Sequence, residues 1–400
     1  MLKKHIFNKI TFTAGSLAII LALFACSTSQ KTETKPENTD NRVLEIETTA
    51  PVEFSEGTAK PEEIVKENKR FEYPVTDKSQ KTIASLSDSH LQKMPVTQFG
   101  EVWAYLMANE TKFYSPDYPI TDIGFFGAGL STFGKLVDVP ARSKMPQTSA
   151  RVHMVVIDNS RALTHFVLDP EFKLRQTLIS SLLKAAEPYD GLQIDFELVS
   201  ADDKEHYWSF LKELKNGLRK DQMLSVAIPA RTKQLKHDAY DYAKISQIVD
   251  RIVVMAYDEH WATSAPGAVA SMEWCNNVMA YSAKVIPQEK LIMGLPFYGR
   301  AWSNDDTAGA YKFSSVDRLF RGENAKGPLS EDTEISPVTI DHGIPTFTVS
   351  KNVTYTFYFD NAWSTSRRLQ MYKNGGVKNV GFWRLGQEDP DIWQLLQIEK

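Results

Sequence analysis

The sequence contains very little cysteine, because only Cys26 and Cys275 occur among its 400 residues. At most one disulfide is therefore possible. Cys275 lies in a stretch with helical amphipathic spacing, close to Trp274, Val278 and Met279. This setting indicates a buried, inert thiol rather than a nucleophile.

An excess of positive charge is also missing. The chain has 46 Lys and Arg residues against 50 Asp and Glu residues, a net charge of -4. This balance gives no reason to expect a surface for polyanions, so nucleic acid is not an expected partner. The hydrophobic content of 42% is ample for a sizeable core.

The apolar run near the start is too short to span a membrane. Residues 1–25 begin Met-Leu-Lys-Lys, continue through the run from Leu17 to Phe24, and end at Ala25 before Cys26. A basic start, a short apolar core and a small residue before the cut are typical of a secretory signal. The ending resembles the bacterial lipobox, which implies that Cys26 is lipidated and that the protein is exported and anchored to a bacterial membrane, in the periplasm or at the cell surface. An ordinary signal peptide with an incidental cysteine is the alternative.

Residues 26–95 are predicted to form a flexible tether and a lead-in to the following domain. From Ser27 to about Gln80 the sequence is rich in Thr, Lys, Glu, Pro and Ser and poor in aromatic residues. Such a segment cannot bury enough apolar surface to offset its ordering entropy. The stretch from Lys81 to Val96 is ambiguous, and a short helix packed against the following domain is one interpretation.

The remaining residues, 96–400, are predicted to form one α/β domain in which strands and helices alternate. The eight predicted strands are residues 102–107, 122–126, 151–157, 191–196, 223–228, 251–256, 291–295 and 380–383. Eight βα units in about 300 residues predict a (β/α)8 TIM barrel, whose chemistry lies at the carboxyl ends of the strands. A doubly wound open sheet is the rival, but no Gly-rich nucleotide turn follows the first strand. Residues 303–353 break the alternation and predict a small α+β insertion after the seventh strand.

The stretch 190–197 has the pattern on which the functional interpretation depends. Apolar residues alternate there with Gln193, Asp195 and Glu197, which predicts a strand with one apolar and one acidic face. Alternate residues on a strand are roughly 6.5 to 7 Å apart, so Asp195 and Glu197 point the same way and titrate as a coupled pair. A solvated edge strand is the alternative. Helical stretches on both sides favour a covered strand, in which carboxylates are costly unless function retains them.

Other predicted strand ends have residues suited to a sugar. Tyr257 and Asp258 end the sixth strand, Tyr298 follows the seventh, and Trp383 ends the eighth. Aromatic rings stack on pyranose faces, and a few polar groups fix the orientation of a ligand. Core packing is equally compatible with any one of these aromatic residues, but their shared location favours a ligand pocket.

Together these residues resemble glycoside hydrolase family 18. Residues 190–197 match the signature Asp-Gly-x-x-x-Asp-x-Glu of that family, and residues 224–230, 249–261 and 383–390 resemble its spore-germination-protein branch. The resemblance extends over essentially 100–395. Many chitinases of the family have a further Asp where this chain has Gln193, which cannot share a proton, although a hydrogen bond to Asp195 is possible.

The resemblance implies a retaining glycosidase in which the acetamido oxygen of the substrate attacks the anomeric carbon. Glu197 is the implied general acid and then base, while Asp195 and Tyr257 hold the acetamido group. An ionised Asp195 is expected to raise the pKa of Glu197. Asp190 and Gln193 are implied supporting residues. The expected substrate contacts are Asp258, Tyr298, Trp383, Trp103 and Arg384. No cofactor and no metal are implied.

The expected substrate is a β-linked N-acetylhexosamine polymer, because this mechanism requires a 2-acetamido group. For a monomeric, lipid-anchored protein, peptidoglycan cut after N-acetylglucosamine is favoured over chitin-type oligosaccharides. Two alternatives of other classes are open. One is a non-catalytic sugar-binding lipoprotein, which the presence of both Asp195 and Glu197 argues against. The other is a metal-dependent barrel enzyme that uses Asp258, Glu259 and His260.

Overall fold

The computed structural model describes residues 94–303 and 308–399. The predicted signal segment, Cys26 and almost all of the predicted tether lie outside the described residues. Within the part that is described, no helix combines the length and the hydropathy needed to cross a membrane.

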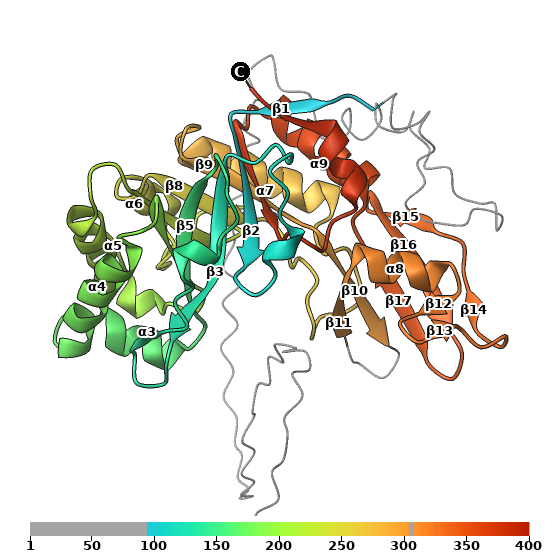
Figure 1. The fold of residues 1–400 in the computed structure, drawn as a ribbon, viewed down its shortest axis with the longest axis horizontal. Coiled ribbons are helices and arrows are strands. Elements are labelled where there is room, and N and C mark those ends of the chain that lie inside the picture. Colours follow the sequence, from blue (N-terminus) through green and yellow to red (C-terminus); the bar gives the residue numbers. More distant parts are fainter. Residues whose placement is uncertain (1–93, 304–307, 400) are drawn as a thin grey trace, which may run out of the picture. The chain divides into compact units, whose positions relative to one another are not determined.

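Eight parallel strands form a closed barrel, as the sequence predicts (Figure 1). Neighbouring strands pair in sequence order, and β18 pairs with β2, which closes the ring. The fold is therefore a TIM barrel and not an open, doubly wound sheet. The barrel strands are β2 (Glu101–Met107), β3 (Asp122–Leu130), β5 (Arg151–Asp158), β6 (Gly191–Phe196), β7 (Met223–Pro229), β8 (Arg251–Met255), β9 (Leu291–Pro296) and β18 (Asn379–Trp383).

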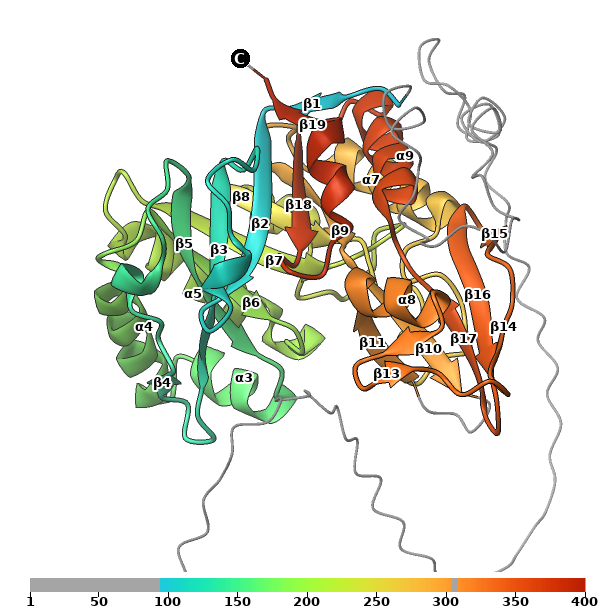
Figure 2. The same ribbon diagram turned by 45° about the vertical axis from the view of Figure 1, so that its right-hand side comes forward.

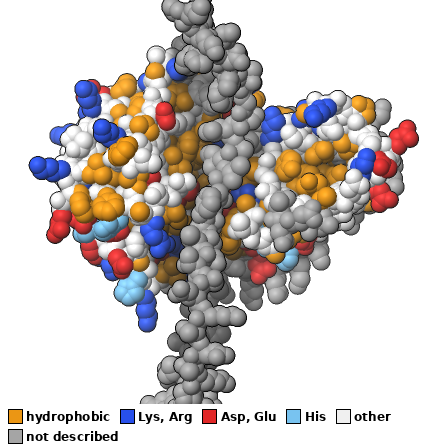
Figure 3. Space-filling view, turned by 90° about the horizontal axis from the view of Figure 1, so that it is seen from below, with side chains coloured by type: hydrophobic (Ala, Val, Ile, Leu, Met, Phe, Trp, Pro, Cys, Tyr) orange, Lys and Arg blue, Asp and Glu red, His pale blue; other side chains and the backbone are white. Residues whose placement is uncertain are grey.

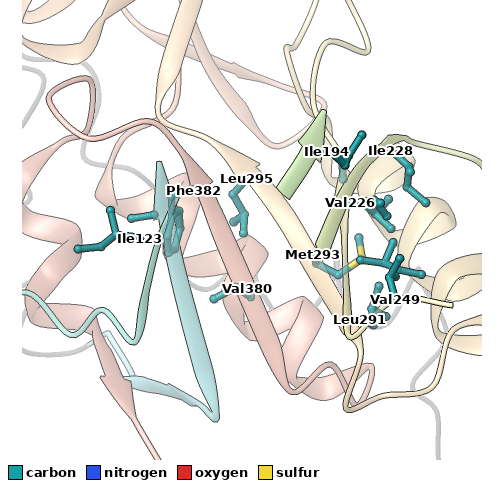
Figure 4. Close-up of a cluster of buried hydrophobic side chains, with 14 of the residues drawn as sticks. Ile123, Ile194, Val226, Ile228, Val249, Leu291, Met293, Leu295, Val380 and Phe382 are labelled. Carbon is teal, nitrogen blue, oxygen red and sulfur yellow. The ribbon is translucent and has the colours of Figure 1, made fainter. Parts of the chain in front are cut away.

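Helices surround the barrel because every second strand residue is apolar and faces outward. Figure 4 shows this core, with Ile194 of β6, Val226 and Ile228 of β7, and Phe382 of β18 among its labelled side chains. The helices that belong to the barrel units are α3 (Arg161–Leu168), α4 (Lys173–Ala186), α5 (Lys204–Gly217), α6 (Tyr242–Ser246), α7 (Met272–Val285) and α9 (Ala362–Asn374).

Short elements complete the barrel domain. The strand β1 (Thr97–Phe99) pairs with β19 (Leu396–Ile398), and β4 (Leu136–Val137) pairs with the end of β3. The 3-10 helices are η2 (Thr111–Phe113), η3 (Arg142–Lys144), η4 (Ala201–Asp203) and η5 (Pro390–Leu395).

A second, antiparallel sheet follows β9 and confirms the predicted α+β insertion (Figure 2). Its buried side chains, among them Ala301, Phe347 and Phe357, pack with Phe313 and Val316 of its helix α8 (Phe313–Phe320). The sheet contains β10 (Tyr298–Ser303), β11 (Ala308–Lys312), β14 (Glu334–Ile335), β15 (Thr339–Asp341), β16 (Ile344–Ser350) and β17 (Thr354–Tyr358). The small pair β12 (Glu323–Asn324) and β13 (Gly327–Pro328) lies between α8 and β14 in the chain.

Charged side chains fill the amino end of the barrel. Both carboxylate oxygens of Glu101 accept hydrogen bonds from Arg251, at 2.8 and 2.7 Å, and one also accepts from Arg151 at 2.8 Å. Arg151 in turn donates to both oxygens of Asp122, at 2.7 and 2.8 Å. The two carboxylates thus face two guanidinium groups, so the interior of the barrel is closed at this end by paired charges.

Candidate active site

The predicted acidic face of β6 lies inside the barrel. The alternate apolar residues Leu192, Ile194 and Phe196 are fully buried in the outer core, so Asp195 and Glu197 project to the inner side. Asp195 is only 4% exposed. Glu197, the first residue after the strand, is exposed at the carboxyl end of the barrel. The pair therefore combines a buried carboxyl group, that of Asp195, with an exposed one, that of Glu197.

The carboxyl group of Asp195 is poorly partnered. Its Oδ1 atom is buried and accepts no hydrogen bond from any residue that the structure describes. Burial raises the pKa of Asp195 well above its usual range, and the negative charge of Glu197 raises it further. In the free protein the neutral acid is therefore favoured at this position, and a ligand that donates to Oδ1 would satisfy an otherwise unpaired oxygen.

The pKa of Glu197 is raised as well, but for a different reason than the sequence suggested. Loss of solvation is the largest cause, and the negative charge of Asp258 is the second. We expected the charge of Asp195 to be responsible. Asp195 is the more deeply buried acid, so its neutral form is favoured. The negative charge that acts on Glu197 therefore comes from Asp258.

The amide of Gln193 is held from both sides. The Tyr105 hydroxyl donates to Gln193 Oε1 at 2.6 Å, and Gln193 Nε2 donates to Ser225 Oγ at 3.1 Å. All three residues are buried. Among the described residues Gln193 makes no hydrogen bond to Asp195. The amide instead links Tyr105 and Ser225 in the buried part of the site. Tyr105 was not among the predicted site residues, although it has the same inward register as Trp103 on β2.

Tyr257 follows β8 and lies near the acid pair. Its pKa is raised well above the usual range, chiefly by burial and then by the nearby Tyr105 and Asp195. Gly294 of β9 makes room for this ring, because a Cβ atom there would lie 3.2 Å from the Tyr257 ring and 2.6 Å from the carbonyl oxygen of Val254. The carbonyl oxygen of Val254 therefore requires a glycine at this position, and the Tyr257 ring packs closely against it.

Asp258 is bound by two residues that follow β9. Its Oδ1 atom accepts hydrogen bonds from the Tyr298 hydroxyl at 2.6 Å and from Arg300 Nε and Nη2 at 3.1 and 2.8 Å. Asp258 has φ of 59°, in the left-handed region that Asp tolerates better than most residues. The sequence reasoning selected Tyr298 but missed Arg300, although the two share one face of a strand at a spacing of two residues.

Trp383 and Arg384 have different surroundings. The Trp383 ring lies over the barrel interior, with its centroid 5.3 Å from that of Tyr105 and 4.9 Å from that of Phe126, and it is partly exposed. It can therefore present a ring face to a ligand. Arg384 is paired with Glu110. The structure does not bring Arg384 into contact with the acid pair.

Two predicted site residues lie at the opposite end of the barrel. Trp103 is fully buried, donates through Nε1 to Glu101 at 3.0 Å and stacks on His153 at a centroid distance of 4.3 Å. The expectation that Trp103 contacts the substrate is therefore wrong. Asp190 precedes β6, and its Oδ2 atom accepts a hydrogen bond from the backbone N–H of Val152 at 2.7 Å. Any support from Asp190 acts on the strand and not on the ligand.

The residues expected to bind a metal in the alternative interpretation, Glu259 and His260 among them, contact different backbone groups. Glu259 accepts from the backbone N–H of Ser271 at 2.8 Å, and His260 Nδ1 contacts the carbonyl oxygen of Ala265 at 2.9 Å. In the described ranges no group of three or more His, Cys, Asp and Glu residues is arranged to hold a metal ion. These contacts indicate structural roles for Glu259 and His260 in the segment after β8.

The carboxyl end of the barrel thus has the parts needed for acid–base chemistry on a sugar. In Figure 2 the arrowhead of β18 marks the carboxyl end of the barrel. Figure 3 shows the molecule from below the view of Figure 1, where hydrophobic side chains lie among acidic and basic ones. A protonatable glutamate, a deeper acid with a free oxygen, a phenol and an aromatic ring converge on one region. This combination suits proton transfer to a neutral, hydroxyl-rich ligand that stacks on an aromatic face.

Comparisons with known proteins identify the family of the chain. The sequence model described as glycosyl hydrolases family 18 matches residues 157–388. The chain is 29% identical over 218 residues to the uncharacterized glycosylase YvbX of Bacillus subtilis, covering 52% of this chain and 61% of that protein. It is 24% identical over 308 residues to the cortical fragment-lytic enzyme of Bacillus anthracis, covering 72% and 70%. The solved structure of the spore cortex-lytic enzyme SleL of Bacillus cereus superposes with a TM-score of 0.66 at 23% identity, covering 76% of each chain.

Proposed function

The chain belongs to glycosyl hydrolase family 18 and is a glycosidase, and on this premise we propose that it hydrolyses β-linked N-acetylhexosamine polymers with retention of configuration. The observation on which the proposal depends is the acid pair of β6. Asp195 is buried with an unpaired oxygen, and Glu197 is exposed two residues further along the same inner face. Substrate-assisted catalysis needs both features.

Glu197 acts as the general acid and then as the general base. In the first step it donates its proton to the glycosidic oxygen while the acetamido oxygen of the same sugar attacks the anomeric carbon, and the leaving alcohol departs. In the second step Glu197 removes a proton from water, which opens the cyclic intermediate. The raised pKa of Glu197 supports this assignment, because a general acid must hold its proton near the working pH.

Asp195 and Tyr257 hold the acetamido group. The free Oδ1 atom of Asp195 can accept the amide N–H of the substrate, and this hydrogen bond favours the ionised form of Asp195. The negative charge then stabilises the positive charge that develops on the oxazolinium ring. Asp195 cannot itself be the nucleophile, because it lies beside Glu197 on one strand and an enzymic nucleophile must reach the opposite face of the sugar.

We further propose that peptidoglycan is the substrate, cut after N-acetylglucosamine, and that the enzyme is exported and anchored through Cys26. A lipid-anchored enzyme outside the cytoplasm meets peptidoglycan directly. Two relatives are named as lytic enzymes of cortex or cortical fragments, which supports a role in breaking down a polymer and a place in the spore-germination-protein branch. Trp383 and Tyr298 are the proposed aromatic contacts to the sugar, and Asp258 is the proposed polar one.

Mass spectrometry of the products tests the substrate. We expect purified peptidoglycan to yield fragments with N-acetylglucosamine at the new reducing end, at a rate well above that of chitin oligomers matched in length. The fragment masses report the bond, and the two rates report the preference. Faster cleavage of the chitin oligomers would replace peptidoglycan by chitin-type oligosaccharides as the substrate. No cleavage of either polymer would contradict the proposed function as a whole.

A further inference from the structure

Arg300 reaches the acid site from outside the barrel. It lies on β10, whose residue Ala301 packs into the α8 core of the inserted sheet, so Tyr298 and Arg300 face the other side. Gly299 allows this approach, because a Cβ atom there would lie 2.5 Å from the carbonyl oxygen of Tyr358 on the neighbouring strand β17. The inserted sheet therefore delivers a guanidinium group to Asp258, which follows barrel strand β8.

The hydrogen bonds of Asp258 are distributed unevenly. All three donors, the Tyr298 hydroxyl and two nitrogens of Arg300, bond the same oxygen, Oδ1. No described residue donates to Oδ2. Arg300 is largely buried, with 14% of its side chain exposed, whereas 41% of the Asp258 side chain is exposed. One carboxylate oxygen is thus fixed by the protein, and the other is left open.

We propose that Arg300 is a positioning residue for the hydrolysis, which holds Asp258 in place and screens its negative charge from Glu197. The inference rests on the proposed function, because that proposal makes Glu197 the general acid. It assigns to the inserted sheet a part in the electrostatics of the acid site. Arg300 itself need not touch the substrate.

The charges around Glu197 support this role. Burial raises the pKa of Glu197 most, and the negative charge of Asp258 raises it further; Arg300 is the cation bonded to Asp258. Arg231, which lies beside Tyr240, is paired with Asp238 at 2.8 Å. The described groups that interact electrostatically at the acid site are Tyr105 of β2, Asp195 and Glu197 of β6, Tyr207 of α5, Tyr240 after β7, Tyr257 and Asp258 after β8, and Tyr298 and Arg300 of β10.

Removal of the guanidinium group should therefore make Glu197 a weaker acid. In Arg300→Met we expect the titration midpoint of Glu197 to rise by about half to one pH unit, and the alkaline limb of the kcat/KM profile to move upward with it. Arg300→Lys keeps the charge but loses the two-nitrogen geometry, so most of the shift should disappear while kcat/KM recovers only in part. The measurement is carbon-13 NMR of the Glu197 carboxyl group in the full chain, assigned with Glu197→Gln.

Two comparisons make the result specific. Arg321→Met removes an equal charge beside α8, where Arg321 pairs with Asp317 at 3.2 Å, and it should leave the midpoint unchanged. In an Asp258→Asn background, Arg300→Met should raise the midpoint less than it does in the wild-type background, because the part of the effect that depends on the position of Asp258 has been removed. Thermal unfolding of each variant establishes that it is folded.

An unchanged Glu197 midpoint in folded Arg300→Met would overturn the inference. So would an equal rise in Arg321→Met, or a rise in the Asp258→Asn background as large as the rise in the wild-type background. The NMR titration needs no turnover. An enzyme that cuts no N-acetylhexosamine polymer would contradict the proposed function, while the titration would still decide the role of Arg300.

Discussion

Glu197→Gln is expected to lower kcat/KM by about three to four orders of magnitude and to leave sugar binding intact. Gln has nearly the shape of Glu but cannot donate or accept the proton that the reaction transfers. Since Glu197 is exposed and has no described ion-pair partner, the substitution leaves no unpaired buried charge behind. Steady-state kinetics gives the loss in rate, and calorimetry with an N-acetylated oligosaccharide gives the affinity.

Glu205→Gln is the matched control. Glu205 is exposed on the first turn of α5, so the same change in charge there should leave kcat/KM at the wild-type value. Near wild-type activity in Glu197→Gln would remove Glu197 from the mechanism. A parallel loss of binding and rate would instead assign Glu197 to substrate binding.

Asp195→Asn is expected to lower kcat about a hundredfold to a thousandfold, the usual effect of removing one preorganised electrostatic contact to a transition state. The Asn side chain can still accept the amide N–H of the substrate, but it cannot supply the negative charge that stabilises the oxazolinium ring. Because burial favours the neutral form of the Asp195 carboxyl group, folding should be little affected. The measurement is kcat at saturating substrate.

Asp202→Asn provides the comparison for Asp195. Asp202 is exposed in η4, a few residues further along the chain, and its replacement should not change kcat. A variant Asp195→Asn with wild-type kcat would exclude charge stabilisation by this residue. An equal increase in KM with unchanged kcat would mean that Asp195 contributes only to binding.

The architecture could be predicted because its signal is local and repeated. Each barrel strand is a short apolar run, and the alternation of Leu192, Ile194 and Phe196 with Gln193, Asp195 and Glu197 fixes which face carries the acids. A period of two is sufficient to place side chains inside or outside a barrel. The inner register of Asp195 and Glu197 follows from the sequence for the same reason.

The depth of a residue within the barrel does not follow from the period-two spacing. Trp103 and Trp383 both belong to the inward face, but Trp103 lies near the start of β2 and Trp383 is the last residue of β18. One is therefore buried among the charged residues of the amino end, and the other lies at the carboxyl end. The position of each residue along its strand decides between them, and the predicted strand 102–107 already places Trp103 near its start.

Contacts between distant segments could not be predicted from the sequence either. Arg300 bonds Asp258 from 42 residues away, and Tyr105 bonds Gln193 from 88 residues away. These partners depend on how the inserted sheet and the closed ring bring strands together. Sequence patterns within one strand contain no such information, which is why the charge acting on Glu197 was assigned to Asp195 instead of Asp258.

The central claim is that the sugar supplies its own nucleophile. It is tested most directly by the rates of cleavage of one polymer in its N-acetylated form and after chemical removal of the acetyl groups. We predict that deacetylation lowers kcat/KM more than about a thousandfold, because the intramolecular acetamido oxygen is lost and no carboxylate of the enzyme can replace it. Equal rates for the two forms would contradict substrate-assisted catalysis by this enzyme.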